Sequence, residues 1–277
     1  MSAAGASGAA GARRVTVRDV ASRKAKGEKI VMVTAYDALF GRLMDESGVD
    51  LILVGDSLAN VVAGLDSTVP VTLDQMIYHA TLVCRGVKRA MVVVDMPFMT
   101  YQVSEERALT NAARVMQESS AHAVKLEGAS DDVARAARRL VAAGVPVMAH
   151  LGFTPQSLHA LGGFRVQGRE PEAARALAEG ARRMEDAGAF ALVLELVPST
   201  VAAEVTASLR IPTIGIGAGA QCDGQVLVTP DLLGLNDTFA PKFLKRYSSM
   251  ADDVRAAVRA FGDDVRGGAY PAPEHGF

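Results

Sequence analysis

Residues 90–128, AMVVVDMPFMTYQVSEERALTNAARVMQESSAHAVKLEG, decide the fold because they contain one complete repeat of strand, helix and strand. The apolar run at 90–94 is typical of a strand that is buried on both faces. Residues 105–119 place apolar side chains at helical spacing behind two acidic residues, and 122–128 form a second apolar run. The segment therefore predicts a βα repeat.

The same alternation extends along most of the chain. The other runs typical of buried parallel strands are IVMVTA at 30–35, DLILVGD at 50–56, PVMAHLG at 146–152, ALVLELV at 191–197, PTIGIG at 212–217 and, more weakly, LLGL at 232–235. Amphipathic stretches lie between them at 36–47, 73–87, 131–144 and 170–188. About eight strands alternate with helices and no linker interrupts them, so the pattern predicts one closed (β/α)8 TIM-type barrel instead of two doubly wound halves.

Both ends of the chain are predicted to add to this barrel. Residues 1–14 are mostly small and have no secretory h-region, so we expect a disordered N-terminal tail. Residues 16–29 are typical of a short helix with a charged turn that plugs the bottom of the barrel, and 250–268 of an extra C-terminal helix for accessory or oligomer contacts. We expect the barrel domain with its accessory helices to cover 15–265, and the Gly- and Pro-rich residues 266–277 to form a flexible tail unless they dock on a partner subunit.

The composition favours an enzyme that acts on small molecules. Lys and Arg total 29 against 31 Asp and Glu, a net charge of -2, which gives no electrostatic reason to bind nucleic acid or an anionic membrane. No apolar run approaches the roughly 18 to 20 residues that span a bilayer. Cys84 and Cys222 are not spaced as a CxxC pair or zinc ligands, which indicates reduced thiols. We therefore expect a soluble, cytoplasmic protein.

Carboxylates end four of the predicted strands. Asp56, Asp95, Glu127 and Glu195 follow apolar runs, at the end of a barrel where chemistry takes place. Carboxylates that converge repel one another, so some must be protonated or a cation must lie among them. Oxygen ligands without Cys or clustered His favour Mg²⁺, with Mn²⁺ or Co²⁺ as substitutes. Asp56, Asp95 and Glu127 are on adjacent strands and are the predicted ligands, whereas Glu195, two βα units later, is the predicted general base.

Lys125 and Glu127 point to the same face of one strand because side chains alternate. The pair is either a buried salt bridge or part of a site. A lysine at a strand end also occurs in aldolases, where it forms a Schiff base. The carboxylates of Glu127 and Asp95, however, keep such a lysine protonated. We therefore expect Lys125 to bind a substrate carboxylate or to stabilise an enolate oxygen.

Three further features have more than one interpretation. His150 is a metal ligand, an acid or an ordinary core histidine, and Ser57 either donates to an anionic ligand or caps the next helix. The glycine run GIGAGAQCDGQ at 215–225 looks like a dinucleotide loop, but no second strand with an acidic end follows about 20 residues on. The run therefore predicts close backbone packing at a barrel rim, or a place where a substrate anion rests.

Several separated strings resemble one family, and they occur in the family's order between Val15 and Tyr247. The strings are VTAYDALFGRLMDESGVDLILVGDSL, VVVDMPFMTY, AVKLEG, VMAHLGFTPQS, LELVP, IPTIGIGAGAQCDGQVLV and FAPKFLKRY. They are similar to those of the ketopantoate hydroxymethyltransferase (3-methyl-2-oxobutanoate hydroxymethyltransferase) family. The resemblance implies a Mg²⁺-dependent transfer of a hydroxymethyl group from 5,10-methylenetetrahydrofolate to 3-methyl-2-oxobutanoate, which forms 2-dehydropantoate for pantothenate and coenzyme A.

The resemblance also implies roles for individual residues. Asp56 and Asp95 match the family's metal ligands, Glu127 its third metal-associated carboxylate and Glu195 its proton acceptor. The positions that match the binding site of the 2-oxoacid are Asp56, Ser57, Asp95 and Lys125. A homo-oligomer, typically a decamer, is implied as well. The alternatives are a metal-dependent 2-oxoacid lyase or aldolase of the phosphoenolpyruvate/pyruvate barrel group, and a barrel that only binds a metabolite or serves in an assembly.

Overall fold

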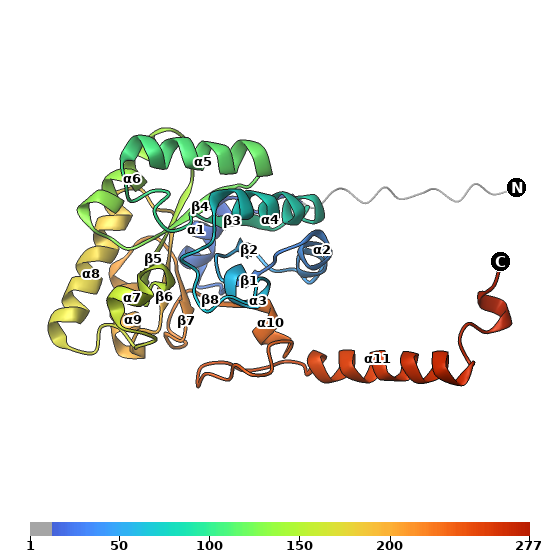
Figure 1. Ribbon diagram of the computed structural model, residues 1–277. Helices are drawn as coiled ribbons and strands as arrows, with labels where there is room; N and C mark the ends of the chain where they lie inside the picture. Colours follow the sequence, from blue (N-terminus) through green and yellow to red (C-terminus); the bar gives the residue numbers. More distant parts are fainter. Residues whose placement is uncertain (1–12) are drawn as a thin grey trace, which may run out of the picture. The chain divides into compact units, whose positions relative to one another are not determined.

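The computed structural model describes residues 13–277 and contains a closed barrel of parallel strands in chain order (Figure 1). The strands are β1 (Ile30–Thr34), β2 (Leu51–Val54), β3 (Met91–Asp95), β4 (Ala123–Glu127), β5 (Val147–Gly152), β6 (Ala191–Glu195), β7 (Thr213–Ile216) and β8 (Gly224–Leu227). All the strand pairs with a recorded register, from β1 with β2 to β7 with β8, are parallel. The predicted (β/α)8 barrel is confirmed.

Helices follow the strands, and the longer ones bury part of their surface. They are α2 (Ala38–Glu46), α4 (Leu73–Gly86), α5 (Glu105–Ser119), α6 (Asp131–Ala142), α8 (Pro171–Asp186) and α9 (Ser199–Ser208), with the short α3 (Leu58–Val61) and α7 (Leu158–Leu161) in the loops. Helix α5 begins where the side chain of Ser104 accepts a hydrogen bond from the backbone N–H of Arg107. Such an N-cap satisfies one of the free amides of the first turn.

The eighth strand is not where the sequence predicted it. Residues 232–235 are the end of α10 (Thr229–Leu232) and the turn after it, so the prediction of a strand at LLGL is wrong. The strand is β8, inside the glycine run. A Cβ on Gly224 would come within 2.5 Å of the carbonyl oxygen of Ile30, so the first residue of β8 has to be glycine where it approaches β1. The predicted close backbone packing of this run is confirmed.

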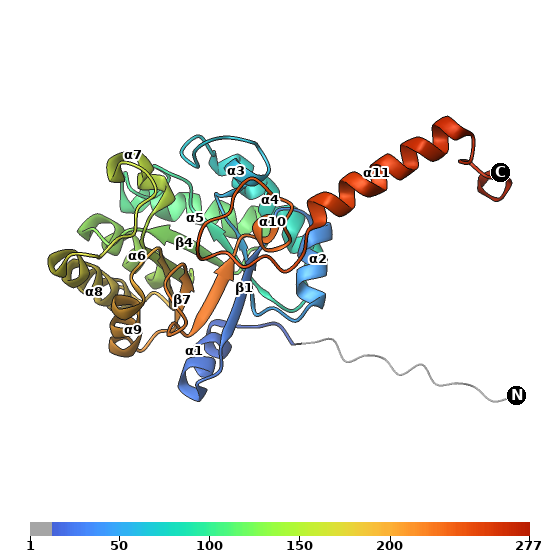
Figure 2. The same ribbon diagram turned by 90° about the horizontal axis from the view of Figure 1, so that it is seen from below.

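Helix α1 (Val17–Lys26) lies beside the start of β1 (Figure 2). Its N-terminus has a capping box, in which the side chain of Thr16 accepts from the N–H of Asp19 and the side chain of Asp19 accepts from the N–H of Thr16. Val20 is fully buried in the cluster that fills the barrel interior. The other members of that cluster are Val15, Ile30, Met32, Leu51, Leu53, Met91, Val93, Ala123, Met148, Ala191, Val193, Ile214 and Val226. The predicted plug at the bottom of the barrel is confirmed.

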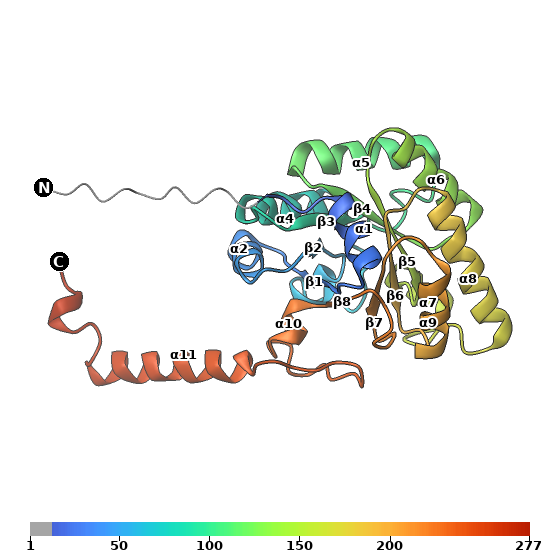
Figure 3. The ribbon, with the colours of Figure 1, turned by 180° about the vertical axis from the view of Figure 1, so that it is seen from behind.

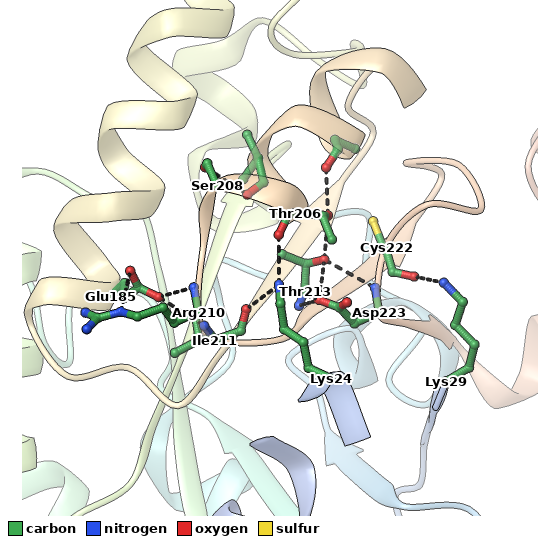
Figure 4. A network of polar contacts seen from close by, with 12 residues as sticks. Lys24, Lys29, Glu185, Thr206, Ser208, Arg210, Ile211, Thr213, Cys222 and Asp223 are labelled. Carbon is green, nitrogen blue, oxygen red and sulfur yellow. Dashed lines mark hydrogen bonds and ion pairs between the residues drawn. The ribbon is translucent and has the colours of Figure 1, made fainter. Parts of the chain in front are cut away.

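A polar network fastens α1 to the loops at the amino ends of the last strands (Figure 4). The ammonium of Lys24 donates to the carbonyl oxygens of Thr206 and Ile211, at 2.8 and 3.0 Å, and contacts Asp223 Oδ2 at 3.0 Å. The same Asp223 oxygen accepts from the backbone N–H of Thr213 at 2.8 Å. Each charge in this network therefore has a partner, which is the usual condition for burying polar groups.

Residues up to Val226 and Leu227–Phe277 form two compact units, and each is described by itself. The second contains α10 and α11 (Met250–Gly267), which confirms the extra C-terminal helix, and a short 3-10 helix at Pro273–His275. The ring of Tyr270 lies between those of Phe261 and His275, at centroid distances of 5.4 and 5.2 Å.

Two further observations concern the chain as a whole. Within residues 13–277, no helix combines the length and the apolar character that a membrane span requires. The disordered tail predicted for residues 1–14 lies, except for Arg13 and Arg14, outside the described residues. Arg13 pairs with Asp19, and Arg14 contacts the ring of His122.

Helix α1 and the strands behind it are seen from the other side in Figure 3.

Candidate active site

The inward-facing residues of the barrel change from apolar to charged at the carboxyl ends of the strands. On β3, Val93 belongs to the core cluster and Asp95 is the next inward position. On β4, Ala123 belongs to the cluster and is followed on the same face by Lys125 and Glu127. Burial of these charged side chains follows from the strand period, and each of the three residues is at most 6% exposed.

Strands β5 and β6 continue the same row of charged residues. His150 follows Met148 on the inner face of β5, and Glu195 follows Val193 on β6. Gly152, with a φ of 94°, is paired in register with Glu195, and a Cβ on it would lie 2.2 Å from the Glu195 carbonyl oxygen. A side chain at this point would push β6 away, so glycine is required for the approach of the two strands.

Lys125 holds the centre of the cluster. Its Nζ lies 2.7 Å from Asp95 Oδ1 and 3.9 Å from Glu127 Oε1. Asp95 and Lys125 are direct neighbours in the register of β3 and β4. The contact between Lys125 and Asp95 is a fully buried ion pair, and it belongs to a larger group of charged residues. The two alternatives for Lys125 and Glu127, a buried salt bridge or part of a site, therefore do not exclude each other.

Asp56 and Ser57 come from the turn after β2. The backbone N–H of Asp56 donates to Asp95 Oδ2 at 3.0 Å, which brings the two carboxyl residues together. Ser57 Oγ lies 2.9 Å from the hydroxyl of Tyr36, and its side chain makes no cap hydrogen bond to α3. The alternative that Ser57 is a helix cap is therefore wrong, because its hydroxyl is turned to Tyr36 instead.

His150 connects the cluster to Glu195. Its Nε2 lies 3.2 Å from Glu195 Oε2, and its Nδ1 lies 3.0 Å from Lys125 Nζ and 3.5 Å from Glu127 Oε1. Burial and Lys125 lower the pKa of His150, but hydrogen bonds with Glu127 and Glu195 outweigh them and raise it to about 9. The contact with Lys125 indicates the opposite, because an ammonium can donate only to an Nδ1 that carries no proton. This contact corresponds to a neutral ring with its proton on Nε2, which lies 3.2 Å from Glu195 Oε2 without a well-aligned hydrogen bond among the described residues.

The carboxylates shift one another's pKa values. Burial, and then the charges of Glu127 and Asp95, raise the pKa of Asp56 well above its usual value. Burial also raises the pKa of Asp95, although Lys125 opposes this. Burial acts against a charge on Lys125, but the carboxylates of Asp95, Glu127 and Asp56 outweigh it and raise its pKa. Lys125 is therefore a cation at neutral pH, whereas Asp56 lies in a place that disfavours its negative charge.

Two buried residues near the cluster were not singled out from the sequence. Gln156, in the 3-10 turn Pro155–Ser157, donates its backbone N–H to Glu127 Oε2 at 3.0 Å and its side-chain Nε2 to Asp56 Oδ2 at 3.1 Å. Tyr101 accepts a hydrogen bond from the backbone N–H of Glu127 at 3.0 Å. Both residues lie in loops, where no strand or helix period marks a side chain as inward-facing. The only signal was that Tyr101 and Gln156 occur in strings similar to the family.

The donor atoms fit a hard divalent cation. The buried atoms Asp95 Oδ1 and Glu127 Oε1 make no well-aligned hydrogen bond within the part of the chain that the structure describes. Among residues 13–277, no three His, Cys, Asp or Glu side chains converge closely enough to enclose a metal ion by themselves. Mg²⁺ is usually bound by one or two carboxylates together with water and substrate oxygens, so one or two of Asp56, Asp95 and Glu127 would be enough protein ligands for it.

A family model described as ketopantoate hydroxymethyltransferase matches residues 14–273. The chain belongs to this family. Members of the family are similar to it over nearly their whole length. The chain is 52% identical over 265 residues to the 3-methyl-2-oxobutanoate hydroxymethyltransferase of Syntrophotalea carbinolica, with 96% of this chain and 99% of that protein covered. It is 54% identical to the enzyme of the same name from Oleidesulfovibrio alaskensis, with 96% and 91% covered.

Solved structures with a much lower identity share the fold of this family member. One is a phosphonopyruvate hydrolase in complex with oxalate and Mg²⁺, which has a TM-score of 0.60 and 12% identity, with 94% of this chain and 92% of that chain covered. At this identity the likeness concerns the barrel alone.

Proposed function

We propose that this protein is a 3-methyl-2-oxobutanoate hydroxymethyltransferase. It transfers a hydroxymethyl group from 5,10-methylenetetrahydrofolate to 3-methyl-2-oxobutanoate and forms 2-dehydropantoate. The observation that carries the proposal is that a member of this family has a buried cation, Lys125, and a carboxylate, Glu195, joined through His150 at one end of its barrel. These are the groups needed to bind an anionic acid and to remove a proton from it.

The proposal includes Mg²⁺, held by Asp56 and Asp95, with Glu127 as the third associated carboxylate. Mg²⁺ supplies a Lewis acid that polarises the keto group of the substrate. The raised pKa values of Asp56 and Asp95 support this assignment, since both carboxylates gain from a further positive charge nearby.

The chain's own residues bind and orient the 2-oxoacid. Lys125 carries a positive charge in a buried place, where a charge acts more strongly than in water. It binds the carboxylate or the keto oxygen, on which negative charge grows as the C3 proton leaves. The hydroxyl of Ser57, aligned by Tyr36, is a donor for the same anion.

Glu195 takes the proton from C3 of the substrate. Its side chain is 17% exposed, more than those of Asp95, Lys125 and Glu127, so it can reach a ligand at the end of the barrel. His150 Nε2 lies 3.2 Å from one of its oxygens, Oε2, and leaves the other for the proton. The methylene bridge of the donor opens at one of its two C–N bonds to an iminium, and the enolate carbon adds to the iminium carbon while the C=N electron pair returns to nitrogen. Water then replaces this second nitrogen, which leaves with a proton as tetrahydrofolate, and a hydroxymethyl group remains on the acid.

Assembly and location are part of the same proposal. We propose a homo-oligomer, with the family's decamer as the expected form, in the cytoplasm. Supporting this, α11 exposes apolar side chains on one face at a spacing of three and four residues, each about half exposed: Val254, Val258, Phe261 and Val265. Light scattering on the eluting protein measures the number of subunits.

A proton NMR experiment on the purified protein in D2O tests the reaction. With Mg²⁺ and 3-methyl-2-oxobutanoate, we expect the C3 proton to exchange with solvent, and 2-dehydropantoate to form only after the folate donor is added. Turnover of a 2-oxoacid without folate would instead identify the lyase or aldolase alternative. If the protein shows no exchange and no turnover, the remaining alternative is a barrel that only binds its ligand.

A further inference from the structure

We propose that Gln156 is a positioning residue that fixes Asp56 and Glu127 relative to each other, and that Tyr101 holds Gln156 in the orientation this requires. The inference rests on the proposed function, because it concerns the cation site of that reaction. Neither residue contacts the reacting atoms in this view. Each acts through the carboxylates that do.

Gln156 reaches carboxyl groups from two different strands. Its backbone N–H donates to Glu127 Oε2 at the end of β4, and its side-chain Nε2 donates to Asp56 Oδ2 after β2. Strand β3 separates β2 and β4 in the barrel. Gln156 is 4% exposed, so these bonds form away from water and are correspondingly strong. Each carboxylate has one oxygen fixed by Gln156, and for Glu127 the other oxygen, Oε1, is the one without a well-aligned hydrogen bond among the described residues.

The amide of Gln156 has one acceptable orientation. Its Nε2 also donates to the carbonyl oxygen of Met96 at 2.9 Å, and its Oε1 accepts from the hydroxyl of Tyr101 at 3.0 Å and from Gln102 Nε2 at 3.2 Å. A flipped amide would place oxygen against the carbonyl of Met96 and the carboxylate of Asp56. The surrounding groups therefore direct the two N–H donors toward Asp56 and Met96.

Tyr101 completes a chain of hydrogen bonds back to Glu127. Its hydroxyl accepts from the backbone N–H of Glu127, and its proton has two acceptors in reach, Gln156 Oε1 at 3.0 Å and the Glu127 carbonyl oxygen at 3.1 Å. The backbone N–H of Glu127 lies beyond the last residue pair of β3 and β4, Asp95 with Lys125, so this hydroxyl takes the place of a strand partner. Tyr101 is 1% exposed, and burial, followed by the charge of Glu127, raises its pKa well above the usual value, so its hydroxyl remains a donor.

Without Gln156, Glu127 would keep His150 and Lys125 beside its Oε1 only, and the carboxylate of Asp56 would lose its side-chain donor. The charge of Glu127 already acts on Asp56. A donor that both carboxylates share keeps them at a set separation when no cation is bound. Outer residues that orient metal ligands typically change metal affinity or activity by about 10- to 100-fold when they are replaced.

Gln156→Leu tests the proposal by a measurement of cation binding. The variant keeps the backbone N–H and the approximate volume but loses the donors to Asp56 and Met96. Titration of the intact protein with Mn²⁺, followed by electron paramagnetic resonance, is expected to show an affinity weakened about 10- to 100-fold. The KM for the 2-oxoacid is expected to rise together with the weaker Mn²⁺ binding.

Tyr101→Phe tests the same chain without a change at Gln156. Loss of one hydrogen bond is expected to weaken Mn²⁺ binding about 2- to 10-fold. In the double variant, the two effects should combine to less than their product, because both single variants break the bond between Tyr101 and Gln156. Gln156→Met, with a side chain of the same length and no donor, serves if the Leu variant does not fold.

Gln167→Leu is the matched control, since Gln167 lies in the same connection between β5 and α8 and its side chain donates to the carbonyl oxygen of Arg165. It should leave Mn²⁺ affinity unchanged. A merely structural role for Gln156 would lower the melting temperature and leave Mn²⁺ affinity and KM within twofold of the parent, and this result would overturn the inference. If the parent protein itself neither binds Mn²⁺ nor exchanges the C3 proton, the proposed function fails, and the inference fails with it.

Discussion

Both ends of the barrel contain buried or half-buried charges, but the two ends differ in the hydrogen bonds that these charges make. At the amino end, Asp223 Oδ2 accepts from Lys24 and from the backbone N–H of Thr213, and Asp50 pairs with Arg23 at 2.5 Å. At the carboxyl end, buried oxygens of Asp95 and Glu127 have no well-aligned hydrogen bond among the described residues.

The difference separates charges that stabilise the fold from charges kept for a ligand. A network with all partners present stabilises the fold, whereas burial and neighbouring carboxylates raise the pKa values of Asp56 and Asp95, so their negative charges oppose folding. In barrels of this type the carboxyl end is the functional one and the amino end is structural. Replacements at the two ends should therefore change different quantities.

Glu195→Gln should have the largest effect. The amide can still accept from His150 but cannot take a proton, so exchange of the C3 proton in D2O should fall about 10²- to 10⁴-fold. Mn²⁺ affinity and melting temperature should stay near those of the parent protein. Undiminished exchange would remove Glu195 from the role of base.

Lys125→Met comes next and tests the cation in the carboxylate group. The variant loses a charge-assisted bond to the substrate, and kcat/KM for the 2-oxoacid should fall about 10- to 100-fold. The raised pKa of Lys125 implies that its amine is not free to form a Schiff base. Treatment of the parent protein with borohydride in the presence of substrate should therefore leave it active. If borohydride inactivates the protein, and EDTA does not prevent this, the result would favour the aldolase alternative.

Asp223→Ala tests the other end of the barrel. It removes the acceptor of Lys24 and of the Thr213 N–H, in a network whose charged side chains are each 17% exposed. Unfolding free energy should fall by about 1–2 kcal/mol, and the melting temperature by about 2–8 °C. Calorimetry measures the shift, and kcat should remain within about twofold, because the removed bonds lie at the amino ends of the strands. A large loss of kcat with an unchanged melting temperature would contradict the division between the two ends.

Asp56→Asn should cause the smallest change in melting temperature, and this change should be an increase. Because the pKa of Asp56 is raised in the folded state, its anion destabilises the fold, and stability falls as pH rises above the unfolded value of 3.8. In EDTA at neutral pH, the variant should melt about 2 °C or more above the parent, and the gap should close as pH approaches 4. Added Mg²⁺ should raise the melting temperature of the parent protein but not that of the variant. A variant that melts below the parent at neutral pH would contradict the assigned repulsion.

The fold was predictable where burial leaves a period in the sequence. Runs such as MVVVD and ALVLE are unbroken because both faces of these strands are covered. Strand β8 was missed because Gly224 and Gln225 interrupt its apolar residues, and the reason for the glycine is a close approach to Ile30 that only the folded backbone contains.

The candidate site was predictable to the same extent. Asp95, Lys125, Glu127 and Glu195 are marked by their place at strand ends, and the structure brings them to one end of the barrel. The link that His150 makes between Lys125 and Glu195 depends on distances across three strands, which no spacing along the chain records. Gln156 was missed for the same reason, and because its partners are set by a loop.

Helix α1 closes one end of the barrel, and the core cluster fills the interior above it. A molecule that lies against Lys125 and Glu195 can therefore arrive and depart only past the carboxyl ends of the strands. Two reactants that use a single entrance cannot exchange independently. If the small acid lies beneath the much larger folate, it has to arrive first, and the hydroxymethylated product has to wait for tetrahydrofolate to leave. Steady-state kinetics should then follow a compulsory order, in which the product competes with the 2-oxoacid alone.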